Sequence, residues 1–349
     1  MAFDNTFTAP WQFLTKYIEQ LKDEPFFLKG VLGKQKIMSP TTSVKWRLIS
    51  KGNELAGMGY RDDPAKSVDL GVTSTEYTAT PPQIFEKDYI ESSTPLLQSF
   101  DPRQLANLDT ASDIYSSLQY IYGAKLQGLK DRVNRRIEWM FAELLKSGSF
   151  SYNDGVRAIS QDYSIGDATA MTISSSTNPL DLMEGYAGTF AQNLGVFPNL
   201  CIMSANVARA FIDHSKVEKF ISKNTFQFGN LKPSYASPSV KFLGAFPEFA
   251  IPEIYVYAGN YTNSSGVVTN YIGDDYLILT NTNYWNLAYG AVIDYEIEPS
   301  GRPIMSEILV KERIPEENEG HIKTVSALSF PLPVLLHTSA VSVYDVTIE

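Results

Sequence analysis

The sequence has a single cysteine, Cys201, among its 349 residues. This excludes an intrachain disulfide and predicts a reducing compartment. Charged residues are also scarce, at 19% of the chain, against roughly 25% in typical soluble domains. No apolar run approaches the ~20 residues that a membrane-spanning helix needs, so we expect no membrane association. The opening residues MAFDNTFTAPWQF lack a basic segment and an apolar segment, so they predict no signal peptide.

Side chains typical of catalysis or metal binding are sparse. The three histidines, His214, His321 and His337, lie far apart, and no pair has metal-ligand spacing. Cys201 lies in NLCIM, which predicts a buried strand with an inert thiol. There is no Gly-x-Ser-x-Gly motif, and adjacent acids such as Asp274-Asp275 are typical of solvated turns. We therefore expect no enzyme activity, no cofactor and no metal.

One stretch approaches a phosphate-binding loop. In GAKLQGLK, Gly123 and Gly128 have the required spacing, but Leu129 stands where the lysine belongs. The stretch also lies inside a predicted helix. We interpret the glycines as packing positions where another backbone approaches closely.

The formal net charge of −10 argues against a dedicated nucleic-acid interface. A local basic run nevertheless contains Lys125, Lys130, Arg132, Arg135 and Arg136. The favoured interpretation is the solvated face of an amphipathic helix. The alternative is weak, sequence-independent contact of Lys130, Arg132, Arg135 and Arg136 with phosphates.

Aromatic residues are abundant, with 20 Tyr and 19 Phe. Together with the low charge, this suits a protein that buries much of its surface against partners. A β-rich monomer with a large core fits the composition equally well. The length suggests about two domains.

Residues 43–90 predict a β-hairpin with an unusually long tip. Val44, Trp46 and Leu48 of SVKWRLISK alternate with polar residues, and TSTEYTATPPQIFEKDYI reads as the return strand. The tip, residues 52–72, is rich in glycine and charge. A two-stranded ribbon is marginal alone in water, so the tip is expected to contact another subunit. The candidate contact residues are Met58, Tyr60, Arg61, Asp63 and Lys66.

A long helix is predicted at about 110–148. Its apolar positions recur every three or four residues: Ile114, Leu118, Tyr122, Leu126, Leu129, Val133, Ile137, Met140 and Leu144. Gly148 supplies a C-terminal stop. A helix of about 37 residues would be about 55 Å long, which indicates a structural spine.

Shorter elements flank this helix. A helix ending before Pro25 is predicted near the N-terminus, and Asp154-Gly155 predicts a hairpin turn. Asn178 and Pro179 begin a further helix that ends at Gly195, and Ser204 is the predicted cap of a helix through SANVARAFIDHSKVEKFIS. Predicted strands then occupy EIYVYAGNY, VVTNYIG, YLILTN, MSEILVKERIP and HIKTVSALSFPLPVLL.

This order of elements resembles the major capsid proteins of tailed bacteriophages, which have the Hong Kong 97-type fold, and among them the lambda-type major head protein family. The similar stretches are FFLKGVLG, GVTSTEYTATPPQIFEKDYI, VYAGNYTNSSGVVTNYIGDDYLILTNTNYWNLAYG and KTVSALSFPLPVLLHTSAVSVYDV. The resemblance covers nearly the whole chain and is weakest at residues 149–178.

The resemblance implies an α+β chain with two domains. The implied parts are an N-terminal arm at 1–39, an extended hairpin loop at 40–84, a peripheral domain with the spine helix at 85–177 and 293–330, and an α/β axial domain at 178–292 and 331–349. The extended loop would lie over a neighbouring subunit.

The implied function is structural. Hexamers and pentamers would form an icosahedral virion shell around double-stranded DNA, assembled in the bacterial cytoplasm, with portal, scaffold and decoration proteins as partners. The basic residues of the spine would face the interior. The alternative is an encapsulin-like compartment with a protein cargo. Some relatives form Lys–Asn isopeptide cross-links from this loop, which carries Lys51 and Lys66, but we expect non-covalent contacts.

Overall fold

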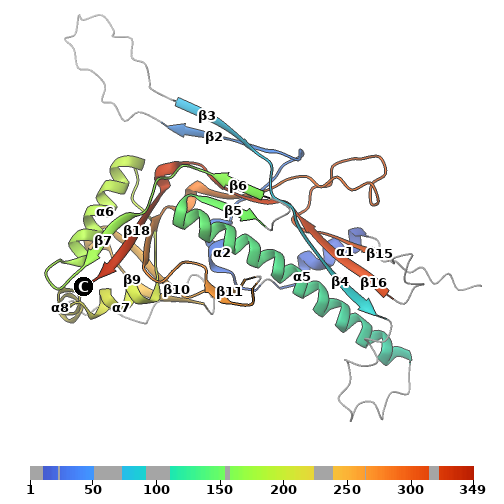
Figure 1. Ribbon diagram of the computed structural model, residues 1–349, viewed down its shortest axis with the longest axis horizontal. Coiled ribbons are helices and arrows are strands. Elements are labelled where there is room, and N and C mark those ends of the chain that lie inside the picture. The colour runs from blue at the N-terminus through green and yellow to red at the C-terminus, as the bar shows by residue number, and fades with distance from the viewer. Residues whose placement is uncertain are drawn as a thin grey trace, which may run out of the picture.

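The computed structural model describes residues 11–22, 24–50, 73–91, 111–153, 158–223, 239–263, 265–313 and 322–349. One long helix, α5, runs across the molecule (Figure 1). A six-stranded sheet with helices α6 to α8 lies toward one end of the view, and strands β4, β15 and β16 lie toward the other. The fold is thus a mixed arrangement of helices and sheets, as the sequence predicts.

Helix α5 spans Ala111–Ser147, 37 residues, so the predicted spine is confirmed. Six positions of its apolar stripe, from Leu126 to Leu144, are at most 4% exposed. The helix ends at Gly148, whose φ of 69° lies in the left-handed region. A Cβ at this glycine would lie 2.1 Å from Ile165 Cγ1, so both the backbone angle and the close approach require glycine.

The N-terminal segment packs against the rest of the chain where the structure describes it. Helix α1 (Trp11–Gln20), helix α2 (Phe27–Leu32) and strand β1 (Lys36–Met38) pack into the body. Leu14, Ile18, Leu28 and Leu32 are at most 2% exposed, and β1 pairs in parallel with β14 (Trp285–Tyr289). Where it is described, the segment predicted as an N-terminal arm at 1–39 thus packs against the body, and α2 was not predicted.

The hairpin is confirmed at its base. Strand β2 (Val44–Ser50) pairs with β3 (Thr73–Ala79) from Val44 opposite Ala79 to Ser50 opposite Thr73. The predicted return strand is two strands, because β4 (Ile84–Glu91) follows a break at Pro81-Pro82 and leaves β2. Proline cannot donate to a strand ladder. Strand β4 instead pairs with β16 (Ile322–Ser329), which pairs with β15 (Leu309–Arg313).

The six-stranded sheet has the order β7-β18-β13-β8-β10-β9. Its strands are β7 (Thr169–Ile173), β8 (Leu200–Met203), β9 (Val240–Phe246), β10 (Ile251–Tyr257), β13 (Tyr276–Thr280) and β18 (Val341–Ile348). Strand β7 pairs in parallel with β18, although the predicted boundary at 177 assigns it to the other domain. Residues 149–178 gave the least sequence signal, so the sequence did not predict this pairing.

Helix α6 (Pro179–Leu194) begins and ends as predicted. The Asn178 side chain accepts a hydrogen bond from Leu180 N at 3.3 Å, and Gly195 has a φ of 81°. The next prediction is corrected, because α7 (Ala205–Asp213) and α8 (Ser215–Lys223) are separated at His214. Ser204 occupies the N-cap position without a capping bond, since its hydroxyl donates to the Asp274 carbonyl.

The remaining strands form small sheets. Strand β5 (Ser149–Asn153) pairs with β6 (Ala158–Asp162), which confirms that hairpin, and β11 (Asn260–Thr262) pairs with β12 (Val268–Asn270). The last predicted strand divides at Phe330 into β16 and β17 (Pro331–Leu335), and β17 pairs with β14. Short 3-10 helices occupy Pro247–Phe249, Thr282–Tyr284 and Thr338–Ala340.

Candidate functional site

The predicted contact residues Met58, Tyr60, Arg61, Asp63 and Lys66 lie outside the described residues, as does Lys51. The structure describes the base of the hairpin. There the Trp46 ring lies 5.6 Å from the Tyr77 ring and 5.8 Å from the Tyr163 ring, between centroids. The Tyr163 hydroxyl donates to the Pro333 carbonyl. The base is therefore fixed to the body, and the two strands run outward from it (Figure 1).

The basic residues of α5 have different surroundings. Lys130 is 6% exposed, and its Nζ donates to the Leu21 carbonyl at 2.5 Å. Arg132 lies 3.1 Å from Glu86, and Arg135 lies 3.8 Å from Glu24. Lys130 is thus buried, so we no longer expect it to contact phosphates. The sequence pattern had placed it on the solvated face of the helix.

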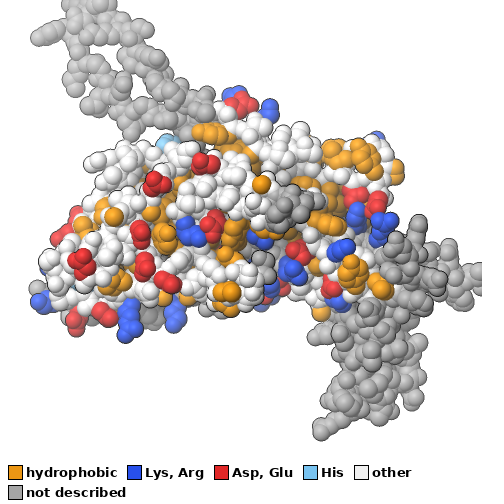
Figure 2. All heavy atoms as spheres, in the orientation of Figure 1, with side chains coloured by type: hydrophobic (Ala, Val, Ile, Leu, Met, Phe, Trp, Pro, Cys, Tyr) orange, Lys and Arg blue, Asp and Glu red, His pale blue; other side chains and the backbone are white. Residues whose placement is uncertain are grey.

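The exposed charges along α5 are balanced. The side chains of Arg132 and Arg135 are 63% and 46% exposed, but each faces a carboxylate, and Lys125 pairs with Asp88 at 2.8 Å. Figure 2 shows basic and acidic side chains interspersed on this side of the molecule. The run that is basic in sequence therefore does not form a strongly positive surface among the described residues.

A buried carboxylate connects α5 to two other parts of the fold. Glu138 is fully buried. Its Oε1 accepts hydrogen bonds from Leu28 N and from the Tyr257 hydroxyl, both at 2.8 Å, and its Oε2 accepts one from Lys29 N at 2.7 Å. The first turn of α2 has no side-chain cap of its own. Glu138 therefore supplies the acceptor that the helix N-terminus needs.

Aromatic packing completes the same junction. The Phe27 ring lies 5.4 Å from the Tyr255 ring and 5.7 Å from the Tyr257 ring, between centroids. Lys29 Nζ donates to Asn134 Oδ1 at 2.7 Å. Burial raises the pKa of Glu138, and the hydrogen bonds from Lys29, Leu28 and Tyr257 oppose that shift. Helix α2 is thereby joined to the spine and to strand β10 at one point.

Sequence reasoning missed this junction. Asn134 and Glu138 are one helical turn apart and adjoin the apolar positions Val133 and Ile137. The available signal was an acidic residue, Glu138, next to the apolar stripe of the helix. A solvated acid at the edge of the stripe would give the same pattern. The partners of Glu138 lie 109 to 119 residues away in the chain, and no local pattern identifies them.

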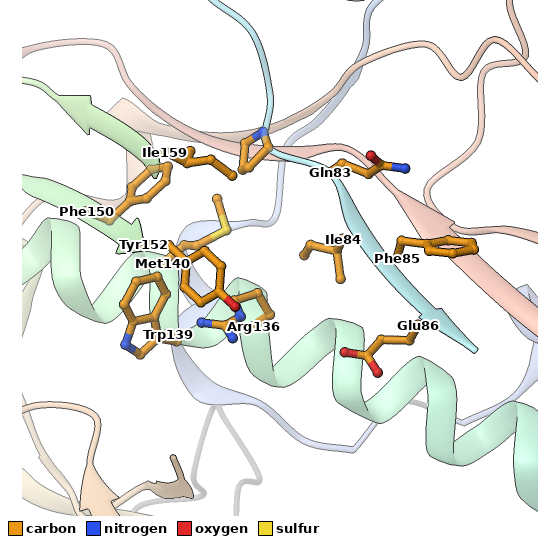
Figure 3. A pocket seen from close by; sticks show the side chains of 11 residues that line it. Gln83, Ile84, Phe85, Glu86, Arg136, Trp139, Met140, Phe150, Tyr152 and Ile159 are labelled. Carbon is orange, nitrogen blue, oxygen red and sulfur yellow. The ribbon is translucent and has the colours of Figure 1, made fainter. Parts of the chain in front are cut away.

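A small groove lies where the start of β4 and the β5–β6 hairpin meet α5. Its volume is about 250 Å³, and it is lined by Pro82–Glu86, by Arg136, Trp139 and Met140 of α5, and by Phe150, Tyr152 and Ile159 of the β5–β6 hairpin. The Arg136 guanidinium carbon lies 5.0 Å from the Trp139 ring centroid and 4.8 Å from that of Tyr152 (Figure 3). These distances fit cation–π contacts. Glu86 lies at the opposite end.

Other predicted positions behave as hydrogen-bonded or buried residues. His214 is 7% exposed and bonds the Ser174 carbonyl through Nε2 at 3.1 Å. The His337 side chain accepts from Ser339 N at 3.2 Å. His321 lies outside the described residues. Cys201 is fully buried, and burial raises the pKa of its thiol, as expected for a strand in the core.

The glycine interpretation is corrected. Nothing lies within 4 Å of a Cβ built on Gly128, and the nearest atom to one on Gly123 is the Tyr17 hydroxyl, at 3.0 Å. Neither glycine admits another backbone. Within the described part of the chain, no group of His, Cys, Asp and Glu is arranged to hold a metal. None of the helices searched there is long and apolar enough to cross a bilayer.

Solved structures share this fold. A crystal structure described as a capsid protein of a prophage of E. coli CFT073 is 18% identical, with a TM-score of 0.70 over 97% of this chain and 99% of that chain. A phage-related protein from Bordetella bronchiseptica RB50 is 13% identical, with a TM-score of 0.51 over 96% of both chains. At these identities the similarity concerns the fold alone.

An encapsulin complex from Synechococcus elongatus PCC 7942 matches less well. Its TM-score is 0.45 at 11% identity, over 93% of this chain and 89% of that chain, which is too low to support an argument. No curated protein sequence matches the chain.

A family model decides the assignment. The model for phage major capsid protein E matches residues 11–341, which is nearly the whole chain. This confirms the resemblance and the Hong Kong 97-type fold class drawn from the order of elements. The chain belongs to the phage major capsid protein E family.

Proposed function

We propose that this protein forms the wall of a tailed-phage head by assembling with copies of itself into hexamers and pentamers of a closed icosahedral shell that holds double-stranded DNA. The family match over residues 11–341 carries this proposal. A portal for DNA, a scaffold during assembly and a decoration protein outside would be its partners.

Electron microscopy of the purified, concentrated protein tests the proposal. Closed shells, tubes or capsomers are expected. Particles from infected or induced cells should contain DNA of genome length and appear after assembly in the bacterial cytoplasm. A protein cargo in place of DNA would favour an encapsulin-like compartment, and a monomer at every concentration would refute self-assembly.

The proposal also assigns a structural role to each part of the chain. The β4–β15–β16 sheet and α5 would form the peripheral domain, and the six-stranded sheet with α6 to α8 the axial domain around the capsomer centre. The hairpin beyond β2 and β3, including Met58, Tyr60, Arg61, Asp63 and Lys66, would contact a neighbouring subunit. The outward course of those strands supports this role (Figure 1).

Weak contact with DNA is proposed for Arg132 and Arg135. Arg136 is excluded from the test because it packs against Trp139 and Tyr152. Converting both arginines to glutamate should lower the DNA-to-protein ratio of particles by less than about tenfold, since few phosphate contacts are involved. Shell yield should change less. Arg209→Glu is the control, because that side chain is 86% exposed on α7. An unchanged DNA content would contradict the proposal.

We also expect the mature shell to be held by non-covalent contacts. Mature particles run on a denaturing gel without reductant should give one band at 38.9 kDa. Cys201 is fully buried, and a disulfide needs Cα atoms within ~7 Å. A ladder of covalent oligomers would overturn this expectation and direct attention first to Lys51 and Lys66.

A further inference from the structure

We propose that strand β12 (Val268–Asn270) pairs antiparallel with β12 of a second copy of the chain, so that two hairpins join into one four-stranded sheet. The inference rests on the proposed function and adds a self-complementary contact between subunits. The β11–β12 hairpin lies at the lower edge of the molecule in Figure 1, below α5, whereas β2 and β3 lie above it. The contact is therefore separate from that of the extended hairpin.

The outer edge of β12 carries unused hydrogen-bonding groups. Among the described residues, β12 pairs with β11 alone. Asn263 N donates to Val267 O at 2.9 Å, and hydrogen-bonded and non-hydrogen-bonded pairs alternate along an antiparallel ladder. The N–H and C=O groups of Val268 and Asn270 therefore point away from β11. No group of the described residues forms a hydrogen bond with these outward groups, so another strand can pair with them.

The absence of charge makes this edge suitable for a second copy. Residues 258–273, AGNYTNSSGVVTNYIG, contain no Asp, Glu, Lys or Arg, although the chain has a net charge of −10. Natural proteins protect open edges with charged side chains, as β4 does with Glu86, Lys87 and Asp88. Copies of an acidic chain repel each other, so a contact between identical surfaces is favoured where neither surface carries charge. Val268, which is 64% exposed, also favours strand pairing.

The hairpin is held in one conformation before any partner binds. In its turn, the Asn263 side chain accepts hydrogen bonds from Ser265 N and Val267 N, both at 3.0 Å. At its base, the Tyr271 hydroxyl donates to the Arg135 carbonyl of α5 at 3.4 Å. Pairing with a second copy therefore orders little additional backbone, which removes part of the entropic cost of association.

One register uses all the outward groups of β12. With Thr269 opposite Thr269 of the second copy, Val268 of each chain lies opposite Asn270 of the other, and these are the residues whose N–H and C=O groups point outward. Thr–Thr cross-strand pairs are favourable, and a small sheet of four strands is more stable than one of two. The arrangement has two-fold symmetry and joins subunits in pairs. It cannot close a ring of five or six by itself, so it connects subunits of adjoining capsomers.

A single cysteine tests the register. Thr269→Cys places two thiols directly opposite each other at a non-hydrogen-bonded position, where Cα atoms are about 4.5 Å apart, within reach of a disulfide. After mild oxidation of assembled particles, a gel without reductant should show dimers and no larger multimers. Ser265→Cys is the matched control, because antiparallel pairing directs the two turns away from each other, and it should stay monomeric. The native Cys201 is fully buried and gives no background.

A pair of proline variants tests the edge independently. Val268→Pro removes an outward N–H that pairing needs but no hydrogen bond within the hairpin. It should raise the protein concentration needed for closed shells at least about tenfold, because each contact loses two hydrogen bonds, and capsomers should still form. Thr262→Pro is the matched control, because Thr262 has the same orientation on the opposite edge, in β11, and it should assemble as the unmodified chain does.

The outcomes separate this contact from the proposed function. Monomers from Thr269→Cys particles, or a ladder beyond the dimer, would overturn the two-fold pairing and leave the shell function intact. Normal assembly of Val268→Pro, or an equal loss in both proline variants, would do the same. Failure of the unmodified chain to assemble would instead refute the proposed function.

Discussion

Replacing Glu138 by leucine is expected to lower the free energy of unfolding by about 3–5 kcal/mol. The change removes the acceptor for Leu28 N, Lys29 N and the Tyr257 hydroxyl. Each buried donor left without a partner costs roughly 1–3 kcal/mol, partly offset because a buried carboxylate is no longer desolvated. The result holds for either protonation state, since both accept hydrogen bonds.

Chemical denaturation of unassembled subunits, followed by tryptophan fluorescence, measures this loss. Two variants give a graded comparison. Tyr257→Phe removes a single hydrogen bond and should cost about 1 kcal/mol. Glu143→Gln lies on the same helix, in a part-exposed pair with Lys146, and should cost less than about 1 kcal/mol. Equal stability of the Glu138 and Glu143 variants would show that the junction contributes nothing.

The same variant should loosen the N-terminal segment first. Helix α2 has six residues and no side-chain cap of its own, so it is too short to be stable without tertiary contacts. Glu138 satisfies two of its backbone N–H groups. Limited proteolysis should therefore cut Glu138→Leu earlier between residues 24 and 38 than it cuts the unmodified chain.

Local chemistry explains what the sequence could predict. Helix α5 follows from a single apolar period, and α6 follows from Asn178, Pro179 and Gly195, which fix its two ends without help from the rest of the fold. The hairpin base follows from alternation along Val44 to Leu48. In each case the deciding residues are neighbours in the chain.

Where residues distant in the chain determine the local structure, prediction from the sequence was wrong or gave no result. Helix α2 depends on a carboxylate 110 residues away. Strand β7 belongs to the six-stranded sheet only because β18 lies beside it. Lys130 is buried and donates to the Leu21 carbonyl, 109 residues away. From the sequence alone it was predicted to be a solvated charge on a helix. The groove likewise unites β4, α5 and the β5–β6 hairpin, which no spacing brings together.

The largest effect on assembly is expected from the hairpin. Replacing residues 52–72 by a short Gly-Ser turn should leave folded subunits or capsomers and abolish closed shells. The described base supports this separation of folding from assembly, because Trp46 packs on Tyr77 and Tyr163 and the described ladder, from Val44 to Ser50, lies outside the replaced residues. A two-residue turn suits such a ladder.

Size-exclusion chromatography and electron microscopy of the shortened variant measure the two outcomes separately. Subunits should elute as folded species with an unchanged denaturation midpoint, since the β2–β3 ladder and the packing of Trp46 lie outside the replaced residues. Shells should be absent at concentrations where the unmodified chain forms them. A scrambled tip of equal length and composition is the control, and it should also fail if side-chain order in MGYRDD matters. A shell is held by many identical weak contacts. Losing one contact per subunit therefore removes that contact at every subunit of the shell. A modest loss of binding free energy at each contact is then enough to prevent closure. Normal closed shells from the shortened chain would contradict the role proposed for the hairpin.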